Sequence, residues 1–225
     1  MKILSIDTSS PICAVAILED NKLIKEISQN SGLTHSEKLM PIINQILLDT
    51  NLKLKDIDLL VCDIGPGSFT GIRIGVATVK AFADSLNIPC VGISSLEALS
   101  YNVSNANYIC SLIDAKNDNA YCGVFDNKHT KIFDFSANHI DVIIDKLKII
   151  SSPITFVGDG AVSYKEKLSS VLSTADFASD NNLSAFNLGL AGLNYYNTNG
   201  ATNNILPLYL RAPKAEQLLE AKKNG

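Results

Sequence analysis

The sequence predicts an α/β fold made of two similar halves, each opening with three strands and continuing with helices and further strands. Two observations predict it: three short apolar segments separated by polar turns open the chain, and a run of the same plan begins near residue 108. The length of 225 residues, 46% of them hydrophobic, is enough to build more than one core.

The first half is predicted from its strands and turns. Three apolar, β-branched-rich runs at residues 3–6, 12–18 and 23–27 are separated by Asp, Asn, Ser and Pro, which favour turns. A helix is predicted from Thr34, because Thr34 and Glu37 have the spacing of a capping box. The remaining expected elements are that helix to residue 48, a strand at 57–64, a glycine-rich loop at 65–71, a helix at about 71–86 and a strand at 88–93.

The second half repeats this plan. Its first strand ends in Asp114 as the first strand of the chain ends in Asp7, and an Asp-Asn-Lys turn follows each, at 20–22 and 126–128. Any two hairpins can share turn residues, but we favour a duplication. We expect domains at 1–103 and 104–225, with the C-terminal segment able to pack back on the first. Further elements are expected as strands at 120–125, 130–135 and 154–157, and helices at 141–150 and 185–196.

Composition argues against several classes of protein. The net charge is −4 and there is no basic stripe, so we do not expect the chain to grip nucleic acid alone. The five cysteines lie in apolar runs without paired spacing, which indicates buried, reduced thiols. No run reaches the roughly 18 apolar residues of a membrane span, and no leader pattern opens the chain, so we expect a cytoplasmic location without membrane contact.

Two loops are candidates for nucleotide contact. The turn after the first strand carries Asp7, Thr8 and Ser9, which are also ordinary turn formers. The loop at 65–71, with Gly65, Gly67 and Ser68, leaves a buried strand and opens a helix, where backbone N–H groups can hold an anion. It is not a Walker A loop, and a tight turn that requires glycine is the alternative.

No metal or catalytic site is expected from the residue pattern. The three histidines, His35, His129 and His139, have no second histidine or cysteine two or four residues away. No arrangement of Ser, His and Asp or of Cys and His indicates a nucleophile.

The helices at 34–48 and 71–86 are apolar over more than one face. Glycine and alanine keep the second helix slim, so that another helix could approach it closely. These faces predict either a helical interface with a partner or burial between the sheet and the second domain.

The loop and helix also carry a family resemblance. The segment Gly65-Pro66-Gly67-Ser68-Phe69-Thr70-Gly71-Ile72-Arg73-Ile74-Gly75 closely resembles the signature of the TsaB (YeaZ) family. Further matches occur in the expected order over nearly the whole chain: Leu4 to Ser9, His35-Ser36-Glu37 with Leu39 and Pro41, Asp114-Ala115-Lys116, and Tyr209-Leu210-Arg211-Ala212-Pro213.

The resemblance implies a duplicated actin-like (ASKHA) fold of two βββαβα-type subdomains, the second abbreviated. It implies a subunit that pairs with TsaD and, with TsaE, supports threonylcarbamoyl transfer to the adenosine beside the anticodon of tRNA. The complex would use ATP, this chain would require no cofactor, and tRNA would be met only through the complex. From the apolar helix faces and the resemblance together, we expect the partner interface to include His35, Leu39, Ile43, Ile46, Leu47, Gly71, Ile74, Gly75, Thr78 and Phe82.

The resemblance also indicates that the chain is not itself an enzyme. TsaD carries a His-x-x-x-His metal pair where this sequence has Ser95 and Leu99, and leucine cannot bind a metal. The family's Asp-Ala-Arg is here Asp114-Ala115-Lys116, which leaves the role of Lys116 open. The alternatives are an actin-like ATPase or kinase that uses Asp7 and the 65–71 loop, and a homodimer formed through the same helices.

Overall fold

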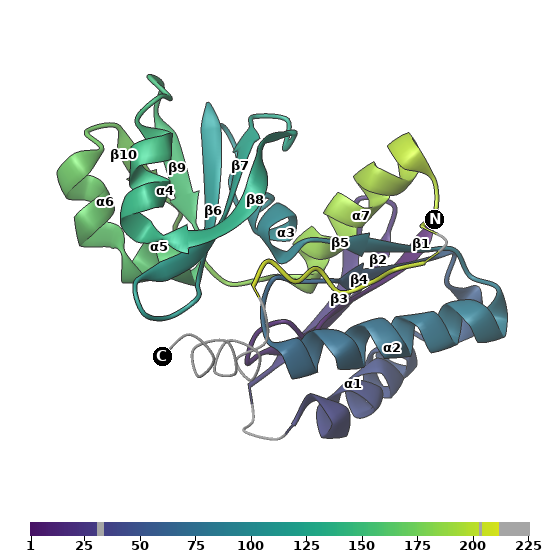
Figure 1. Ribbon diagram of the computed structural model, residues 1–225. Helices are drawn as coiled ribbons and strands as arrows, with labels where there is room; N and C mark the ends of the chain where they lie inside the picture. Colours follow the sequence, from purple (N-terminus) through teal and green to yellow (C-terminus); the bar gives the residue numbers. More distant parts are fainter. Residues whose placement is uncertain (31–33, 203, 212–225) are drawn as a thin grey trace.

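Two five-stranded sheets with the same strand order form the protein, seen here in a computed structural model that describes residues 1–30, 34–202 and 204–211 (Figure 1). The elements of the first half are β1 (Lys2–Asp7), β2 (Cys13–Glu19), β3 (Lys22–Gln29), α1 (His35–Asp49), a 3-10 turn at Leu54–Asp56, β4 (Leu59–Asp63), α2 (Phe69–Leu86), β5 (Cys90–Ile93) and α3 (Ser95–Ser100). Those of the second half are β6 (Tyr108–Asp114), β7 (Asn119–Asp126), β8 (Lys131–His139), α4 (Ile140–Leu147), β9 (Ile154–Val157), α5 (Asp159–Ser163), α6 (Lys165–Val171), β10 (Ala175–Phe177) and α7 (Ala185–Asn199).

The strand order confirms the duplication. The first sheet runs β3-β2-β1-β4-β5 and the second, read from its other edge, β8-β7-β6-β9-β10. In each, the first three strands are antiparallel neighbours, and the fourth pairs in parallel with the first. Each strand of one half therefore has a counterpart in the other.

The central strands of the first sheet are covered on both faces, with α1 and α2 on one side and α7 on the other (Figure 1). Leu4 and Ile6 of β1 pack with residues of α1 and α2, whereas Ile3 packs with residues of α7, as the two-residue period of a strand requires. Thr34 caps α1, and its backbone N–H donates to Glu37 Oε2 at 2.9 Å, which confirms the predicted capping box. All five cysteines are buried and free, as predicted.

The last helix of each half packs on the other half's sheet. The short helix α3 lies against β6 and β7, where Leu96 and Leu99 share a core with Phe125. In the reverse direction, α7 lies against β1, β2, β4 and β5 of the first sheet. The helices α3 and α7 also touch each other between the two sheets (Figure 1). Each core is therefore completed by the other half of the chain.

Specific contacts hold α7 on the first sheet. Glu26 on β3 accepts the backbone N–H of Ala185 at 2.7 Å, so a carboxylate lies at the positive end of α7. The Ser5 hydroxyl donates to the carbonyl of Ala185 at 2.6 Å. A Cβ at Gly189 would lie 2.6 Å from Leu18 Cδ1, and one at Gly192 would overlap Val61. The two glycines thus let α7 approach the strands closely.

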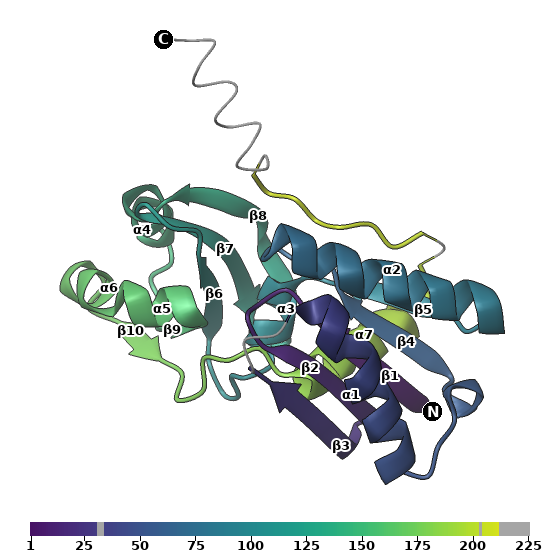
Figure 2. The same ribbon diagram turned by 90° about the horizontal axis from the view of Figure 1, so that it is seen from below.

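The segment after α7 returns along α2 toward the second sheet (Figure 2). The Leu208 N–H donates to the Ile64 carbonyl at 2.7 Å, and Arg73 Nε donates to the Tyr209 hydroxyl at 2.7 Å. Arg211 Nη1 then donates to the Ala115 carbonyl of the second half at 3.1 Å. Ala212 and Pro213, the end of the predicted C-terminal motif, lie outside the described residues.

Sequence reasoning did not predict the short helices α3, α5 and α6, the strand β10 or the 3-10 turn. It placed the start of α2 at about residue 71, but the helix begins at Phe69 because Ser68 is its N-cap. It extended the helix that begins at Ile140 to residue 150, but α4 ends at Leu147. None of the helices in the described ranges is long and apolar enough to cross a membrane.

We predict that Gly192→Ala destabilises the protein. Helix propensity alone favours alanine by about 1 kcal/mol, but the added methyl would overlap Val61, and overpacking of this kind costs about 1–3 kcal/mol. Chemical denaturation followed by circular dichroism measures the difference. Asn197→Ala, at an exposed position of the same helix, is the control, and a Gly192→Ala protein as stable as this control would contradict close packing of α7.

Candidate functional site

Two buried carboxyl groups lie side by side where β1 and β4 end. These strands pair in parallel, with Ile6 opposite Cys62, so that Asp7 and Asp63 are the next residues along each. Their side chains are 0% and 1% exposed. Parallel register therefore brings together two acids that are far apart in the sequence.

Hydroxyl and backbone donors surround the pair. The Ser9 N–H donates to Asp7 Oδ1 at 2.7 Å, and the Ser9 hydroxyl donates to Asp63 Oδ2 at 3.1 Å. Asp63 Oδ1 accepts the Ser95 hydroxyl at 2.7 Å and the Gly65 N–H at 2.6 Å. Asp7 Oδ2 has no hydrogen-bond partner among the described residues. The pair thus joins β1, β4, the 65–71 loop and α3.

Desolvation controls the protonation of these acids. Burial raises the pKa of Asp7. Burial, followed by the nearby negative charge of Asp7, raises the pKa of Asp63 well above its usual value. Two like charges this close in a buried site disfavour joint ionisation.

The glycine-rich loop packs against the turn after β1. A Cβ at Gly67 would overlap the Ser9 carbonyl, and one at Gly71 would overlap the Thr8 carbonyl. The N–H of Ser68 donates to the Ser9 carbonyl at 2.7 Å. Gly65 has a φ of +100°, which favours glycine. These contacts account for the glycines through packing and backbone conformation, the alternative left open by the sequence.

An open cleft of about 510 Å³ lies between the two halves. Among the residues predicted for nucleotide contact, Ser9, Gly67 and Ser68 line it, whereas Asp7, Thr8 and Gly65 are buried and are not part of its lining. The second half contributes Asp114, Ala115, Lys116, Tyr121, Asp159, Asn181, Asn182 and Leu183. The cleft therefore combines the turn after β1 with the equivalent turn after β6.

Asp114, at the end of β6, lines the cleft, whereas its counterpart Asp7, at the end of β1, is buried. Lys116 Nζ lies 2.6 Å from Asp114 Oδ2, and this contact helps hold the pKa of Asp114 below its usual value. Burial alone would raise the pKa of Asp114, but the ammonium group and the backbone N–H of Lys116 lower it by more. The Lys116 ammonium is therefore already paired at the cleft wall.

The outer surfaces of α1 and α2 form a second candidate site. Five residues predicted for the partner interface lie instead in the protein's own interior: Leu39, Ile43, Ile46, Gly71 and Gly75. The prediction was wrong for these because α1 turns its apolar stripe toward β2 and β3, while the glycines of α2 pack against the turn after β1.

The other predicted interface residues stay partly accessible: His35, Leu47, Ile74, Thr78 and Phe82. On the same two helices, Met40 is 50% and Leu48 67% exposed on α1, and Ala77 and Ala81 are exposed on α2. Phe69 and Tyr209 stack with ring centroids 4.8 Å apart, so the C-terminal segment covers another side of α2. We call the surface of Met40, Leu48, Ile74, Ala77, Thr78 and Ala81 the α1–α2 face.

The histidines are spread over the molecule. His129 stacks on Tyr101, and His139 caps α4. His35 begins α1. Within the described ranges, no group of three or more His, Cys, Asp or Glu side chains is arranged to hold a metal ion.

We predict that Asp63→Asn reduces the pH dependence of stability. Because the folded pKa of Asp63 lies above its unfolded value, the unfolded chain loses this proton first, and the free energy of unfolding falls as pH rises above about 4. The stabilisation that protonated Asp63 contributes is thus fully present below its unfolded pKa and is lost as the pH rises through its folded pKa. Denaturant titrations at several pH values measure how the free energy of unfolding changes with pH. Asp63→Asn should remove the contribution of Asp63 to this slope, because an amide does not titrate.

Asp84→Asn, an exposed change on α2, is the control and should leave the slope as in the unmodified protein. Ser95→Ala should lower stability at neutral pH, since it removes a donor to the carboxylate. An Asp63→Asn protein with the original slope would show that this pair does not set the pH dependence.

Comparisons with known proteins agree with this architecture. The family model for "tRNA N6-adenosine threonylcarbamoyltransferase" (TsaD) matches residues 25–216. The tRNA threonylcarbamoyladenosine biosynthesis protein TsaB of Bacillus subtilis is 30% identical over 99% of this chain and 100% of its own length.

Solved structures extend the comparison. A Pseudomonas aeruginosa protein described as similar to peptidase YeaZ superposes with a TM-score of 0.80 at 24% identity, over 93% of this chain and 99% of that one. The activator of 2-hydroxyisocaproyl-CoA dehydratase from Clostridium difficile, solved with bound ADPNP, has a TM-score of 0.52 at 12% identity, over 91% and 99%. The duplicated actin-like fold is thereby confirmed. With a relative that is 30% identical along its full length, the chain belongs to the TsaB (YeaZ) family, which is related to TsaD.

Proposed function

We propose that this chain is a non-catalytic subunit that pairs with TsaD and acts with TsaE in threonylcarbamoyl transfer to the adenosine beside the anticodon of tRNA. The names of its relatives place them in threonylcarbamoyladenosine biosynthesis, and the matching family model is named for the transferase. In this proposal the complex uses ATP and contacts tRNA, and the subunit acts in the cytoplasm.

The α1–α2 face is the observation that carries the pairing. Met40 and Leu48 expose large apolar side chains, and Ala77 and Ala81 keep the neighbouring helix slim. Small residues at a helix contact shorten the distance between helix axes. A pair of partner helices could therefore pack here and cover the exposed apolar side chains. The same face could join two copies of this chain in the absence of TsaD.

The positions of the TsaD metal ligands support a role without catalysis. Ser95 is fully buried and donates to Asp63, and Leu99 is 2% exposed within the core that joins α3 to the second sheet. Both side chains therefore serve the protein's own structure, Ser95 through its hydrogen bond and Leu99 through packing. A metal at this place would need ligands that neither supplies.

We predict that Ala77→Arg weakens the complex with TsaD at least about tenfold, which corresponds to ~1.4 kcal/mol. The arginine can extend into water in the free subunit, but it prevents close approach of a partner helix. Ile74→Asp should act in the same direction, because it places a charge in an apolar contact. Co-purification and isothermal titration with TsaD measure the effect.

Val142→Arg, at an exposed apolar position on α4, is the matched control and should leave pairing intact. Modification of tRNA in vitro, with each protein omitted in turn, should require this chain. Pairing that is unaffected by Ala77→Arg and Ile74→Asp would remove the α1–α2 face from the interface. No pairing at all would contradict the proposed function.

The cleft favours one second candidate, an actin-like ATPase or kinase. It has the size of a small-ligand site, and the dehydratase activator of similar fold was solved with ADPNP. Saturable ATP turnover by the isolated chain, lost in Lys116→Ala or Asp7→Asn, would support this candidate. Turnover only in the presence of TsaD would reject it.

A further inference from the structure

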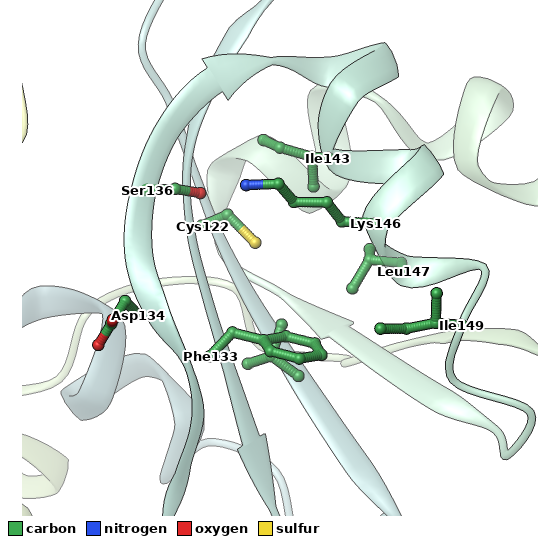
Figure 3. Close-up of a pocket in the computed structure, with 9 residues that line it drawn as sticks. Cys122, Phe133, Asp134, Ser136, Ile143, Lys146, Leu147 and Ile149 are labelled. Atoms are coloured by element: carbon green, nitrogen blue, oxygen red, sulfur yellow. The ribbon is translucent and has the colours of Figure 1, made fainter.

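An apolar groove opens between β8 and α4 in the second half, away from the cleft and from the α1–α2 face. Its volume is about 380 Å³ (Figure 3). The lining residues are Cys122, Val124, Phe133, Asp134, Ser136, Ile143, Lys146, Leu147 and Ile149. Most of these side chains are apolar, and none of them belongs to the sites described above.

The duplication explains why this sheet face is open. In the first half, α1 has 15 residues and covers β2 and β3 with Leu39, Ile43 and Ile46. Its counterpart α4 has only 8 residues and ends at Leu147. The part of β7 and β8 that a longer helix would cover is therefore left bare, and Ile149 beyond the helix is 71% exposed.

One positive charge at the groove, that of Lys146, has no carboxylate partner in the part of the chain that the structure describes. Lys131, Lys148 and Lys167 each pair with an aspartate of the same region, Asp134, Asp145 and Asp141 respectively. No carboxylate of the described residues lies within 4.0 Å of the ammonium group of Lys146. Figure 3 shows the Lys146 side chain extending from α4 toward Ser136 on β8. Among the described residues, the groove thus carries the Lys146 ammonium without a carboxylate partner and the Ser136 hydroxyl, while the carboxylate of Asp134, which also lines it, is paired with Lys131.

We propose that this groove binds a small amphipathic carboxylate. The hydrocarbon part lies against Val124, Phe133 and Leu147, and the carboxylate binds Lys146 and the Ser136 hydroxyl. The volume lies near the lower end of the roughly 300–1,000 Å³ found for small-ligand pockets, which suits a short alkyl chain or a single ring. Lys146, the one cation of the groove lining without a carboxylate partner among the described residues, favours a singly charged head group.

The direct test titrates the full-length protein with straight-chain carboxylates from six to twelve carbons, beside the alcohols of equal length, by isothermal titration calorimetry. Affinity should rise about fourfold per added methylene until the chain exceeds the groove, and each carboxylate should bind about tenfold more tightly than its alcohol.

Two variants separate the contribution of the Lys146 charge from that of the apolar groove. Lys146→Met keeps the aliphatic chain and should remove the preference for the carboxylate without changing alcohol binding. Ser136→Phe should fill the groove and abolish both. Lys148→Met, at a neighbouring lysine that does not line the groove, is the matched control and should bind as the unmodified protein does. Circular dichroism melting establishes that each variant is folded.

Binding of no carboxylate below millimolar concentration, or binding that Lys146→Met and Ser136→Phe leave unchanged, overturns the proposal. Loss of TsaD or TsaE pairing in a folded Ser136→Phe protein, without carboxylate binding to the original, would identify the groove as a protein interface and would equally overturn it. Pairing with TsaD through the α1–α2 face does not depend on either result.

Discussion

One face of each sheet in this protein is covered by a helix that the other half of the chain supplies. The helix α7 lies on the first sheet and α3 on the second, and the two touch where they cross. Removal of either would leave one face of a sheet in water, because an amphipathic layer must be covered to be stable. The cleft between the halves and the contact of Ser95 with the buried acid Asp63 both depend on this exchange.

The acid pair shows how the exchange sets the site. Ser95, at the start of α3, donates to Asp63 at the end of β4 just before the chain enters the second half. Gly65 donates to the same carboxylate, so that the glycine-rich loop and α3 share one anchor. Hydrogen bonds to Asp63 therefore fix both the start of α3, which leads into the second half, and the glycine-rich loop that lines the cleft.

Sequence patterns predicted the repeated units well because they are local. Polar turns delimited the strands, and the capping pair Thr34 and Glu37 located the start of α1. The helices α3, α5 and α6, with 6, 5 and 7 residues, are too short for a helical period to be recognised, and β10, with 3 residues, contains no apolar run.

The candidate sites were predicted less completely, for physical reasons. The pairing of Asp7 with Asp63 depends on the parallel register of β1 and β4, which no local pattern contains. The one available signal was that each acid ends an apolar strand run. Leu39 and Ile43 were assigned to a partner surface because a helix that is apolar on two sides does not indicate which side faces its own sheet.

The position of α7 also has a consequence for synthesis on the ribosome. The first sheet is complete once β5 ends at Ile93, but the helix that covers its second face ends at Asn199. At about 5–20 residues per second, this interval lasts roughly 5–20 s. During that time Ile3, Leu59 and Val61 have no covering helix. The emerging chain therefore presents an apolar surface to chaperones until α7 has been synthesised.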